Sequence, residues 1–337
     1  MTRPATNWFG HSLDDDEASI VSVLSDFATA APTPPASDDE TAVAKARRSL
    51  AEFGFWTPGT AEEHGGGGAG YRLTTIALER LGRYWPALAL ASAQAHTAVD
   101  VLAPLPAFAD LVADVQAGNA SVAVLEHARL SVDGTGVTGF SGRVDIADIP
   151  AHLLVLNGES AVLVAPQALR TPVRLGRTGL AGALTWAAEI DGSAWVLPAR
   201  DWSRVRAGLH LRRAAVAVGI AGAAYDAAAG YASVRRQFGG PLDALPTVRA
   251  ALDASADQVA TNLAALFGAE SATGVVAAAV LRGACEAAVE VATAAVQVHG
   301  GYGYLDEYPV ARHLRDAISL RATVSDAWRD VPLREAG

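Results

Sequence analysis

The chain has 337 residues, of which 51% are hydrophobic and 18% are charged, and its formal net charge is -10. This apolar content is sufficient for a sizeable core, and the length suggests two or three structural units. An acidic chain does not offer the clustered cations that phosphate contacts require, so a nucleic-acid-binding surface is not expected. The N-terminal segment lacks the apolar stretch of a signal peptide, and no segment reaches the roughly 20 consecutive apolar residues of a membrane span. We therefore expect a cytoplasmic protein without a membrane span.

Residue counts and motifs exclude several kinds of chemistry. Cys285 is the only cysteine, which excludes disulfides within the chain and thiolate zinc sites; its alanine-rich surroundings predict a buried thiol. Lys45 is the only lysine, which argues against lysine Schiff-base chemistry. The scattered histidines form no HExxH motif, so no metal site is expected. His64 precedes four glycines, as in the oxyanion loop of esterases, but no G-x-S-x-G nucleophile elbow accompanies it.

The first third of the chain predicts helices. A polar cap at Ser12, followed by an acidic run, is typical of a helix start. The proline-rich segment 32–40 predicts a loop. The remaining expected helical segments are 41–53, ending before Gly54, then 71–85, and 86–117 with a break at Pro104 and Pro106.

The middle of the chain changes to short, alternating, β-branched segments over residues 120–200, which predicts strands and turns. Long helical patterns then return over 203–238, 245–268, 271–298 and 309–327. Helices, strands and helices follow one another without βαβ alternation, which favours segregated α and β layers. We expect an α+β fold that is mainly helical, with three domains: 1–118 helical, 119–202 a reduced β domain, and 203–337 a helical bundle.

The sequence YASVRRQFGGPL, residues 231–242, closes the first long C-terminal helix. In one interpretation, Arg235 and Arg236 cap the last carbonyls of the helix and Gly239 or Gly240 adopts the left-handed cap conformation. In the other, one arginine projects toward an anion such as a pyrophosphate. Local physics leaves both open.

The sequence QVHGGYGYLDEYPVARHLRDA, residues 297–317, contains a tight aromatic-rich loop between two helices. Glycines permit a close approach of the backbone to a ligand, and they equally permit a plain turn between helices. No strand precedes the G-x-G, so the dinucleotide fingerprint of a Rossmann fold does not apply.

Together these two segments resemble the acyl-CoA dehydrogenase family, which carries Y-A-x-x-R-x-x-F-G-x-P and, further on, Q-x-x-G-G-x-G-[YF]-x-x-E-Y-P-x-x-R-x-x-R-D-A. The N-terminal EEHGGGGAG and ALERLGRYW are similar to two shorter segments of the family. The resemblance implies an N-terminal helical domain, a central β domain and a C-terminal four-helix bundle, assembled as dimers or tetramers. It also implies α,β-dehydrogenation of an acyl-CoA thioester with FAD as the cofactor.

The resemblance carries FAD contacts over to specific positions of this chain. In relatives, the residues at these positions bind the pyrophosphate and adenosine of an FAD whose flavin ring lies in a neighbouring subunit. A loop glutamine that usually follows the arginine by eleven positions is replaced here by Pro246. The matching residues are Arg235, Gln237, Phe238, Gln297, Gly300 and Gly301.

Neither position that carries the catalytic glutamate in the family is acidic here. Seven residues beyond the R-D-A triplet the chain has Val324, and the alternative position on the first long C-terminal helix is Leu209. Asp326 lies two residues past Val324, where a helix has turned by about 200°, so it is expected to face elsewhere.

The β segment also departs from the family pattern. Glu126 matches the glutamate of a T-E-P motif, but the G-S-D that follows in relatives is absent. GRVDIAD, residues 142–148, replaces the family's G-K-x-[WF]-I-T-N, so the aromatic residue and the threonine beside the flavin ring are missing.

The chain keeps the residues that match the FAD contacts but lacks the catalytic glutamate and the residues beside the flavin ring. This contrast favours the interpretation that the chain is a subunit of a heteromeric dehydrogenase. A homologous partner would bear the glutamate, and an electron-transfer flavoprotein would be the acceptor. Two alternatives remain: a self-sufficient flavoenzyme with a different base, and a flavin-free scaffold.

Overall fold

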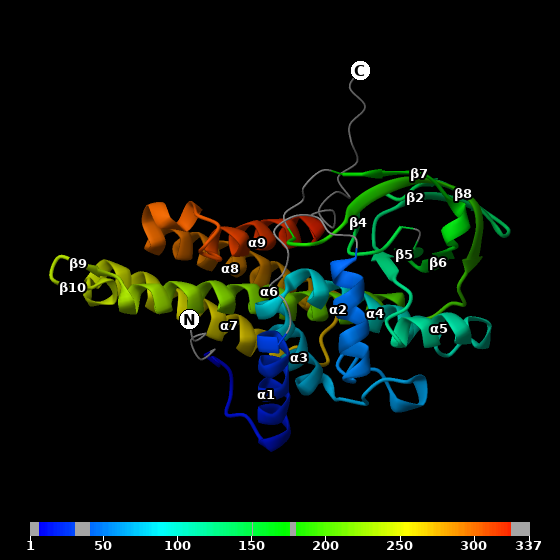
Figure 1. Cartoon of the computed structure of the whole chain (residues 1–337). Helices are drawn as coiled ribbons and strands as arrows, with labels where there is room; N and C mark the ends of the chain where they lie inside the picture. The colour runs from blue at the N-terminus through cyan, green and yellow to red at the C-terminus, as the bar shows by residue number, and fades with distance from the viewer. Residues whose placement is uncertain (1–6, 31–40, 150, 176–179, 325–337) are drawn as a thin grey trace.

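The structure, a computed structural model, describes residues 7–30, 41–149, 151–175 and 180–324. The predicted loop 32–40 lies outside these residues. Of the N-terminal helices, α3 and α4 pack against the long helix α6 of the C-terminal bundle (Figure 1). The helices that precede the sheet are α1 (Asp15–Ala30), α2 (Ala42–Glu52), α3 (Tyr71–Tyr84), α4 (Pro86–Leu102) and α5 (Ala109–Gln116).

The first helix is capped at Asp14. The Asp14 carboxylate accepts a hydrogen bond of 2.9 Å from the Glu17 backbone N–H, and the Glu17 carboxylate accepts one of 3.1 Å from the Asp14 N–H. This reciprocal pair is a capping box, which satisfies two amide groups that the helix leaves free. The expectation that Ser12 caps this helix was therefore wrong by two residues.

The glycine run before α3 is a packed loop. A side-chain carbon at Gly66 would lie 2.2 Å from the Thr60 carbonyl oxygen, so the backbone approach there requires glycine. The Gln116 side chain donates to the His64 carbonyl and ties the loop to α5. These contacts explain the loop without a catalytic role for His64.

The central sheet is mixed, with the strand order β1-β5-β6-β8-β3-β2 and with β4 and β7 also paired to β8. The β1–β5 pair is parallel and the other pairs are antiparallel. Leu154 and Leu156 face the core shared with the helices, while Leu153 and Val155 face a second core inside the sheet domain. Both faces of β5 are thus buried, which explains its uninterrupted apolar sequence. The strands are β1 (Val122–Leu125), β2 (Arg129–Asp133), β3 (Gly136–Phe140), β4 (Val144–Asp145), β5 (His152–Asn157), β6 (Ser160–Val164), β7 (Leu169–Arg174) and β8 (Thr185–Val196).

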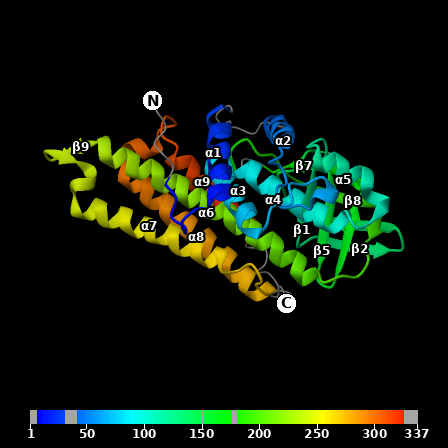
Figure 2. The same cartoon turned by 90° about the horizontal axis from the view of Figure 1, so that it is seen from below.

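Four helices form the C-terminal bundle: α6 (Trp202–Val234), α7 (Pro246–Phe267), α8 (Gly274–His299) and α9 (Val310–Val324). Their layout confirms the expected fold class, with helical N- and C-terminal parts around a sheet. The three proposed domain boundaries stay a prediction, because one apolar core runs through the N-terminal helices, the bundle and one face of the sheet. Figure 2 shows the sheet at one end of the bundle and, at the other, a small hairpin that begins with β9 (Arg236–Gln237).

The long helix α6 ends earlier than expected. It stops at Val234 rather than near residue 238, because β9 (Arg236–Gln237) pairs with β10 (Gly240–Pro241) in a small hairpin. Phe238 and Gly239 form its turn, with φ values of 52° and 86°. Gly239 is therefore left-handed as a turn residue and not as the cap of the helix.

Two glycines set the contact between α3 and α6. A side-chain carbon at Gly82 would lie 2.8 Å from the Val216 carbonyl oxygen, and one at Gly219 would lie 2.3 Å from the Glu79 carbonyl oxygen. The helices therefore touch backbone to backbone. Beside this contact, Arg83 forms a buried ion pair of 2.7 Å with Glu79 and pairs with Asp226 of α6.

Helix α6 is long and apolar enough to meet the length and composition of a membrane span. Its most apolar 18-residue window has a mean hydropathy of 1.2. Of that window, 67% is buried inside the molecule, and long core helices pass the same test. Its apolar surface is matched by α3, α4 and α8, which pack on it.

Candidate functional site

The six residues assigned to FAD contacts lie together at the end of the bundle that is distant from the sheet (Figure 1). The hairpin after α6 carries three of them, and the end of α8 with the loop that follows carries the others. All six are exposed. They form part of an outer surface, and a ligand held there would be shared with whatever faces that surface.

The hairpin presents its turn residue to solvent. Phe238 is 84% exposed although it occupies a left-handed position that costs a side-chain-bearing residue energy. The base of the hairpin is closed by a hydrogen bond of 2.8 Å from the Leu242 N–H to the Arg235 carbonyl. An exposed aromatic ring on a fixed turn can stack on a planar group such as an adenine.

The glycine loop leaves its backbone open. Gly300 has φ 57° and ψ −137°, a conformation that only glycine adopts readily, and it ends α8. A side-chain carbon at Gly300 or Gly301 would touch nothing within 4 Å, so the protein itself does not need the missing side chains for packing. Gly303 differs, because a side-chain carbon there would lie 2.8 Å from the Val296 carbonyl oxygen. The open face therefore lies over Gly300 and Gly301.

An aromatic cluster that the sequence analysis did not identify joins the two motifs. The Tyr231 ring stacks on the His299 ring, with centroids 4.2 Å apart and planes at 20°. Tyr308 packs on both, at 5.6 Å from Tyr231 and 5.4 Å from His299. In the sequence, the only sign of this cluster was that both motifs are rich in aromatic residues. The rings can meet only because α6 and α8 end side by side.

The surface around Arg235, Phe238, Gly300 and Gly301, which we call the distal surface, has groups suited to an anionic dinucleotide. The Arg235 guanidinium lies over the Tyr302 ring at 5.2 Å from its centroid, and no carboxylate forms an ion pair with it within the described ranges. An uncompensated arginine beside open glycine backbone suits a diphosphate, and Phe238 suits a base. Pro246, where the family has a glutamine, begins α7 as its first residue.

The positions that the resemblance places near the flavin ring and substrate meet at the other end of the bundle. Glu126 follows β1, the segment 142–148 contains β4, and Val324 ends α9. Glu126 and Val324 line one cavity of about 280 Å³, together with His210 and Arg282. A smaller cavity of about 40 Å³ shares Glu126 with it and reaches Arg143 and Asp145. We call these two cavities the junction crevice.

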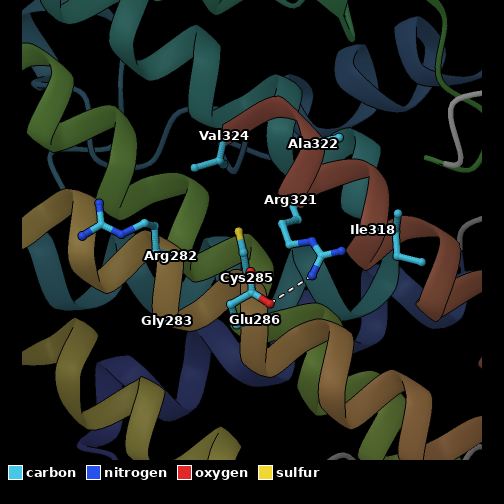
Figure 3. A pocket seen from close by; sticks show the side chains of 8 residues that line it. All are labelled: Arg282, Gly283, Cys285, Glu286, Ile318, Arg321, Ala322 and Val324. Atoms are coloured by element: carbon cyan, nitrogen blue, oxygen red, sulfur yellow. Dashed lines mark hydrogen bonds and ion pairs between the residues drawn. The ribbon is translucent and has the colours of Figure 1, made fainter. Parts of the chain in front are cut away.

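A third cavity, of about 630 Å³, lies between α8 and α9 and shares Arg282 and Val324 with the junction crevice. Figure 3 shows Arg321 reaching from α9 to Glu286 of α8 across it, an ion pair of 3.0 Å. Cys285 also lines this cavity, although it is 2% exposed, and burial raises the pKa of its thiol to about 12. The expectation of a buried thiol is confirmed.

Several residues that line the junction crevice form ion pairs. Glu126 contacts His210 Nε2 at 2.7 Å and Arg213 Nη1 at 2.6 Å. Burial raises the pKa of Glu126, but the hydrogen bond from His210 and the charge of Arg213 outweigh it and hold the pKa at about 2. Arg143 binds both carboxylate oxygens of Asp145, at 2.7 and 2.8 Å.

The three positions considered for a catalytic base have different surroundings. Val324 is 7% exposed and lines two of the cavities, whereas Leu209 is fully buried in the apolar core. Asp326 lies outside the described residues. Asp316 of the R-D-A triplet is buried, and burial raises its pKa to about 7, but it accepts a hydrogen bond of 3.0 Å from the Ala181 N–H and does not line these cavities. It ties the segment before β8 to α9.

Helices that precede and follow a sheet in the chain, with these two motifs at the far end of the bundle, are typical of a class of flavin-dependent dehydrogenases. The N-terminal domain model of acyl-CoA dehydrogenases matches residues 14–109, and the C-terminal domain model matches residues 202–323. Together the two matches cover more than half of the chain. The chain therefore belongs to the acyl-CoA dehydrogenase family.

Similar proteins support this assignment. The short-chain specific acyl-CoA dehydrogenase of Megasphaera elsdenii is 44% identical over 110 residues, which are 31% of this chain and 29% of that protein, so the match spans less than a third of the relative. The structure of butyryl-CoA dehydrogenase from Megasphaera elsdenii superposes with a TM-score of 0.77 at 20% identity, covering 95% of this chain and all of that one. The Tcur3481-Tcur3483 steroid ACAD superposes with a TM-score of 0.75 at 23% identity, covering 92% of each chain. These two superpositions establish the fold.

Proposed function

We propose that this chain is a subunit of an FAD-dependent acyl-CoA dehydrogenase and contributes contacts to the adenosine and pyrophosphate of FAD. The catalytic carboxylate then belongs to a homologous partner subunit. In the proposed reaction that carboxylate removes the α-proton of an acyl-CoA thioester, and FAD, when bound, accepts the β-hydride. Steroid or lipid acyl-CoA degradation, with an electron-transfer flavoprotein as acceptor, is the setting that the family and the steroid ACAD neighbour favour.

The observation that carries this proposal is the contrast between the two ends of the bundle. At the distal end, Arg235 forms no ion pair among the described residues, and Gly300 and Gly301 have an open backbone. A diphosphate is bound by such groups, and they can come from a subunit other than the one that performs the chemistry. At the junction crevice, the position of the family base is Val324, which cannot accept a proton.

The carboxylates that line the junction crevice and the cavity between α8 and α9 do not replace that base. Three of them line the cavities in the described part of the chain, and each is held by an arginine: Glu126 by Arg213, Asp145 by Arg143, and Glu286 by Arg321. An efficient general base has a pKa near the working pH, whereas the pKa of Glu126 is about 2. Among the described residues, the carboxylates that line these cavities are therefore engaged in ion pairs, which supports a proton acceptor from a partner subunit.

The test is the visible spectrum of the purified chain, alone and co-expressed with a separately encoded dehydrogenase-like homologue. We expect flavin absorbance only in the co-purified assembly, bleached when acyl-CoA is added. Strong flavin absorbance and bleaching in the lone chain would overturn the subunit assignment, and Asp326→Asn would then be the variant to test for the missing base.

Arg235→Ala should lower the flavin content of the assembly without lowering the thermal stability of its flavin-free form. Arg236→Ala is the matched control, because the neighbouring arginine is equally exposed but has no ring contact among the described residues. Equal effects of the two variants would indicate a general effect of surface charge and would count against a specific diphosphate contact.

A further inference from the structure

We infer that Tyr302 is a positioning residue for Arg235, orienting its guanidinium toward a bound anion without neutralising its charge. This inference rests on the proposed function, since it concerns the same FAD contact. It adds a residue at a position that the sequence motif leaves unspecified, the x of G-G-x-G.

Arg235 lies at an exposed place at the end of the bundle. Arg235 follows the last residue of α6, and its backbone N–H still donates to the Tyr231 carbonyl at 2.9 Å. An exposed arginine in such a position has many rotamers, and ordering them costs free energy when a ligand binds. The ring of Tyr302 removes part of that freedom, because the guanidinium lies over it at 5.2 Å.

Tyr302 is itself held in place. Its ring packs on Tyr308 with centroids 5.8 Å apart, and Tyr308 packs edge-on against Tyr231 at 5.6 Å. Tyr231 lies one helical turn before Arg235 on α6. The contacts therefore form a closed ring that begins and ends on the same helix turn, which fixes the Tyr302 ring relative to Arg235.

An aromatic ring is suited to this task because of its charge. A carboxylate would also orient the guanidinium, as Glu126 does with Arg213 at 2.6 Å, but it would cancel the positive charge that attracts a diphosphate. The π-face of tyrosine attracts the cation while leaving its N–H donors at the edge of the guanidinium plane for another acceptor. Among the described residues Arg235 has this ring contact and no ion pair.

The experiment measures the dissociation constant of FAD from the assembly in which the chain binds it, after removal and stepwise return of the flavin. The variants are Tyr302→Phe, which keeps the ring, and Tyr302→Leu and Tyr302→Gln, which remove it; two ring-free variants are used in case one does not fold. Tyr304→Leu is the matched control, since Tyr304 is 78% exposed and two residues away.

We expect Arg235→Ala to weaken FAD binding about tenfold or more, as expected for the loss of a charged hydrogen bond. The ring-free variants should weaken it about two- to fivefold, the effect of an exposed cation–π contact, while Tyr302→Phe and Tyr304→Leu stay near the wild type. In the Arg235→Ala background, Tyr302→Leu should cause no further loss, because Tyr302 acts through Arg235.

Other outcomes separate the two ideas. If Arg235→Ala does not change the dissociation constant of FAD, the proposed FAD contact is wrong, and so is the proposed role of Tyr302. If Arg235→Ala weakens binding but the ring-free variants match Tyr304→Leu, only the role of Tyr302 is overturned. An undiminished loss from Tyr302→Leu in the Arg235→Ala background would mean that the ring supports the loop and does not act through the arginine.

Discussion

Glu126 and Arg213 form an ion pair of 2.6 Å that joins the residue after β1 to the middle of α6. Both side chains are about nine-tenths buried, with exposed fractions of 10% and 7%. The pair therefore connects the sheet to the bundle where Glu126 lines the junction crevice.

Replacing one partner of this pair should be costly. Arg213→Met leaves the Glu126 charge buried without its main cation, and we expect the free energy of unfolding to fall by about 3–5 kcal/mol. Urea unfolding at pH 7 and fixed protein concentration measures the change. Arg321→Met is the matched control, because its pair with Glu286 is 40% and 59% exposed and such pairs contribute about 1 kcal/mol or less. Similar losses in both variants would mean that the junction pair is not buried in solution.

Because the His96 ring is buried in its neutral form, we expect the protein to lose stability in mild acid. Its Nδ1 contacts the Ser92 carbonyl at 2.9 Å and its Nε2 accepts from the Gly59 N–H at 3.1 Å, so the neutral ring is required. Burial, assisted by the charge of Arg212, lowers its pKa from 6.5 to about 4. Because the unfolded chain binds the proton more tightly, stability is full above about pH 6.5 and falls as the pH drops toward 4.

The full size of this loss is about 3 kcal/mol. His96→Gln should flatten the dependence of unfolding free energy on pH between 6.5 and 4, as followed by urea titrations at several pH values. His127→Gln, at an exposed position, controls for the loss of one histidine. An unchanged slope in His96→Gln would contradict the assignment to His96.

The contact between α3 and α6 should tolerate no side chain at Gly219. In Gly219→Ala the new carbon would meet the Glu79 carbonyl oxygen at 2.3 Å, so the helices must separate, and we expect a loss of about 1–3 kcal/mol. Gly208→Ala, in the same helix, meets only the Arg212 side chain at 3.7 Å and should stabilise by about 0.5–1 kcal/mol. Thermal unfolding of the two variants should therefore shift in opposite directions. A stabilised Gly219→Ala would show that the helices do not pack this closely.

Cys285 offers a probe of the cavity between α8 and α9. Because burial raises its thiol pKa from 9.0 to about 12, the reactive thiolate should be about a thousandfold rarer than in a free cysteine near neutral pH. We expect slow labelling by a disulfide reagent at pH 8 in the native protein and rapid labelling in urea. Rapid native labelling would indicate that α8 and α9 separate readily.

Local sequence signals predicted much of the fold. The helix expected over 71–85 is α3, and the glycine at position 54 follows α2 with φ 75°. Helical periodicity and the ending of a helix at glycine depend on residues a few positions apart. These features can therefore be predicted without tertiary information. The absence of an acidic residue at positions 324 and 209 is likewise a property of the sequence alone.

Tertiary structure decided the rest, because it depends on residues far apart in the chain. Helix α6 stops at Val234 since a hairpin competes with the helical pattern there. Glu126 forms an ion pair with Arg213, 87 residues away, while Arg235 contacts the aromatic ring of Tyr302 and forms no ion pair among the described residues. Sequence determined which groups are present at each end of the bundle, and packing determined which of them remain available to bind.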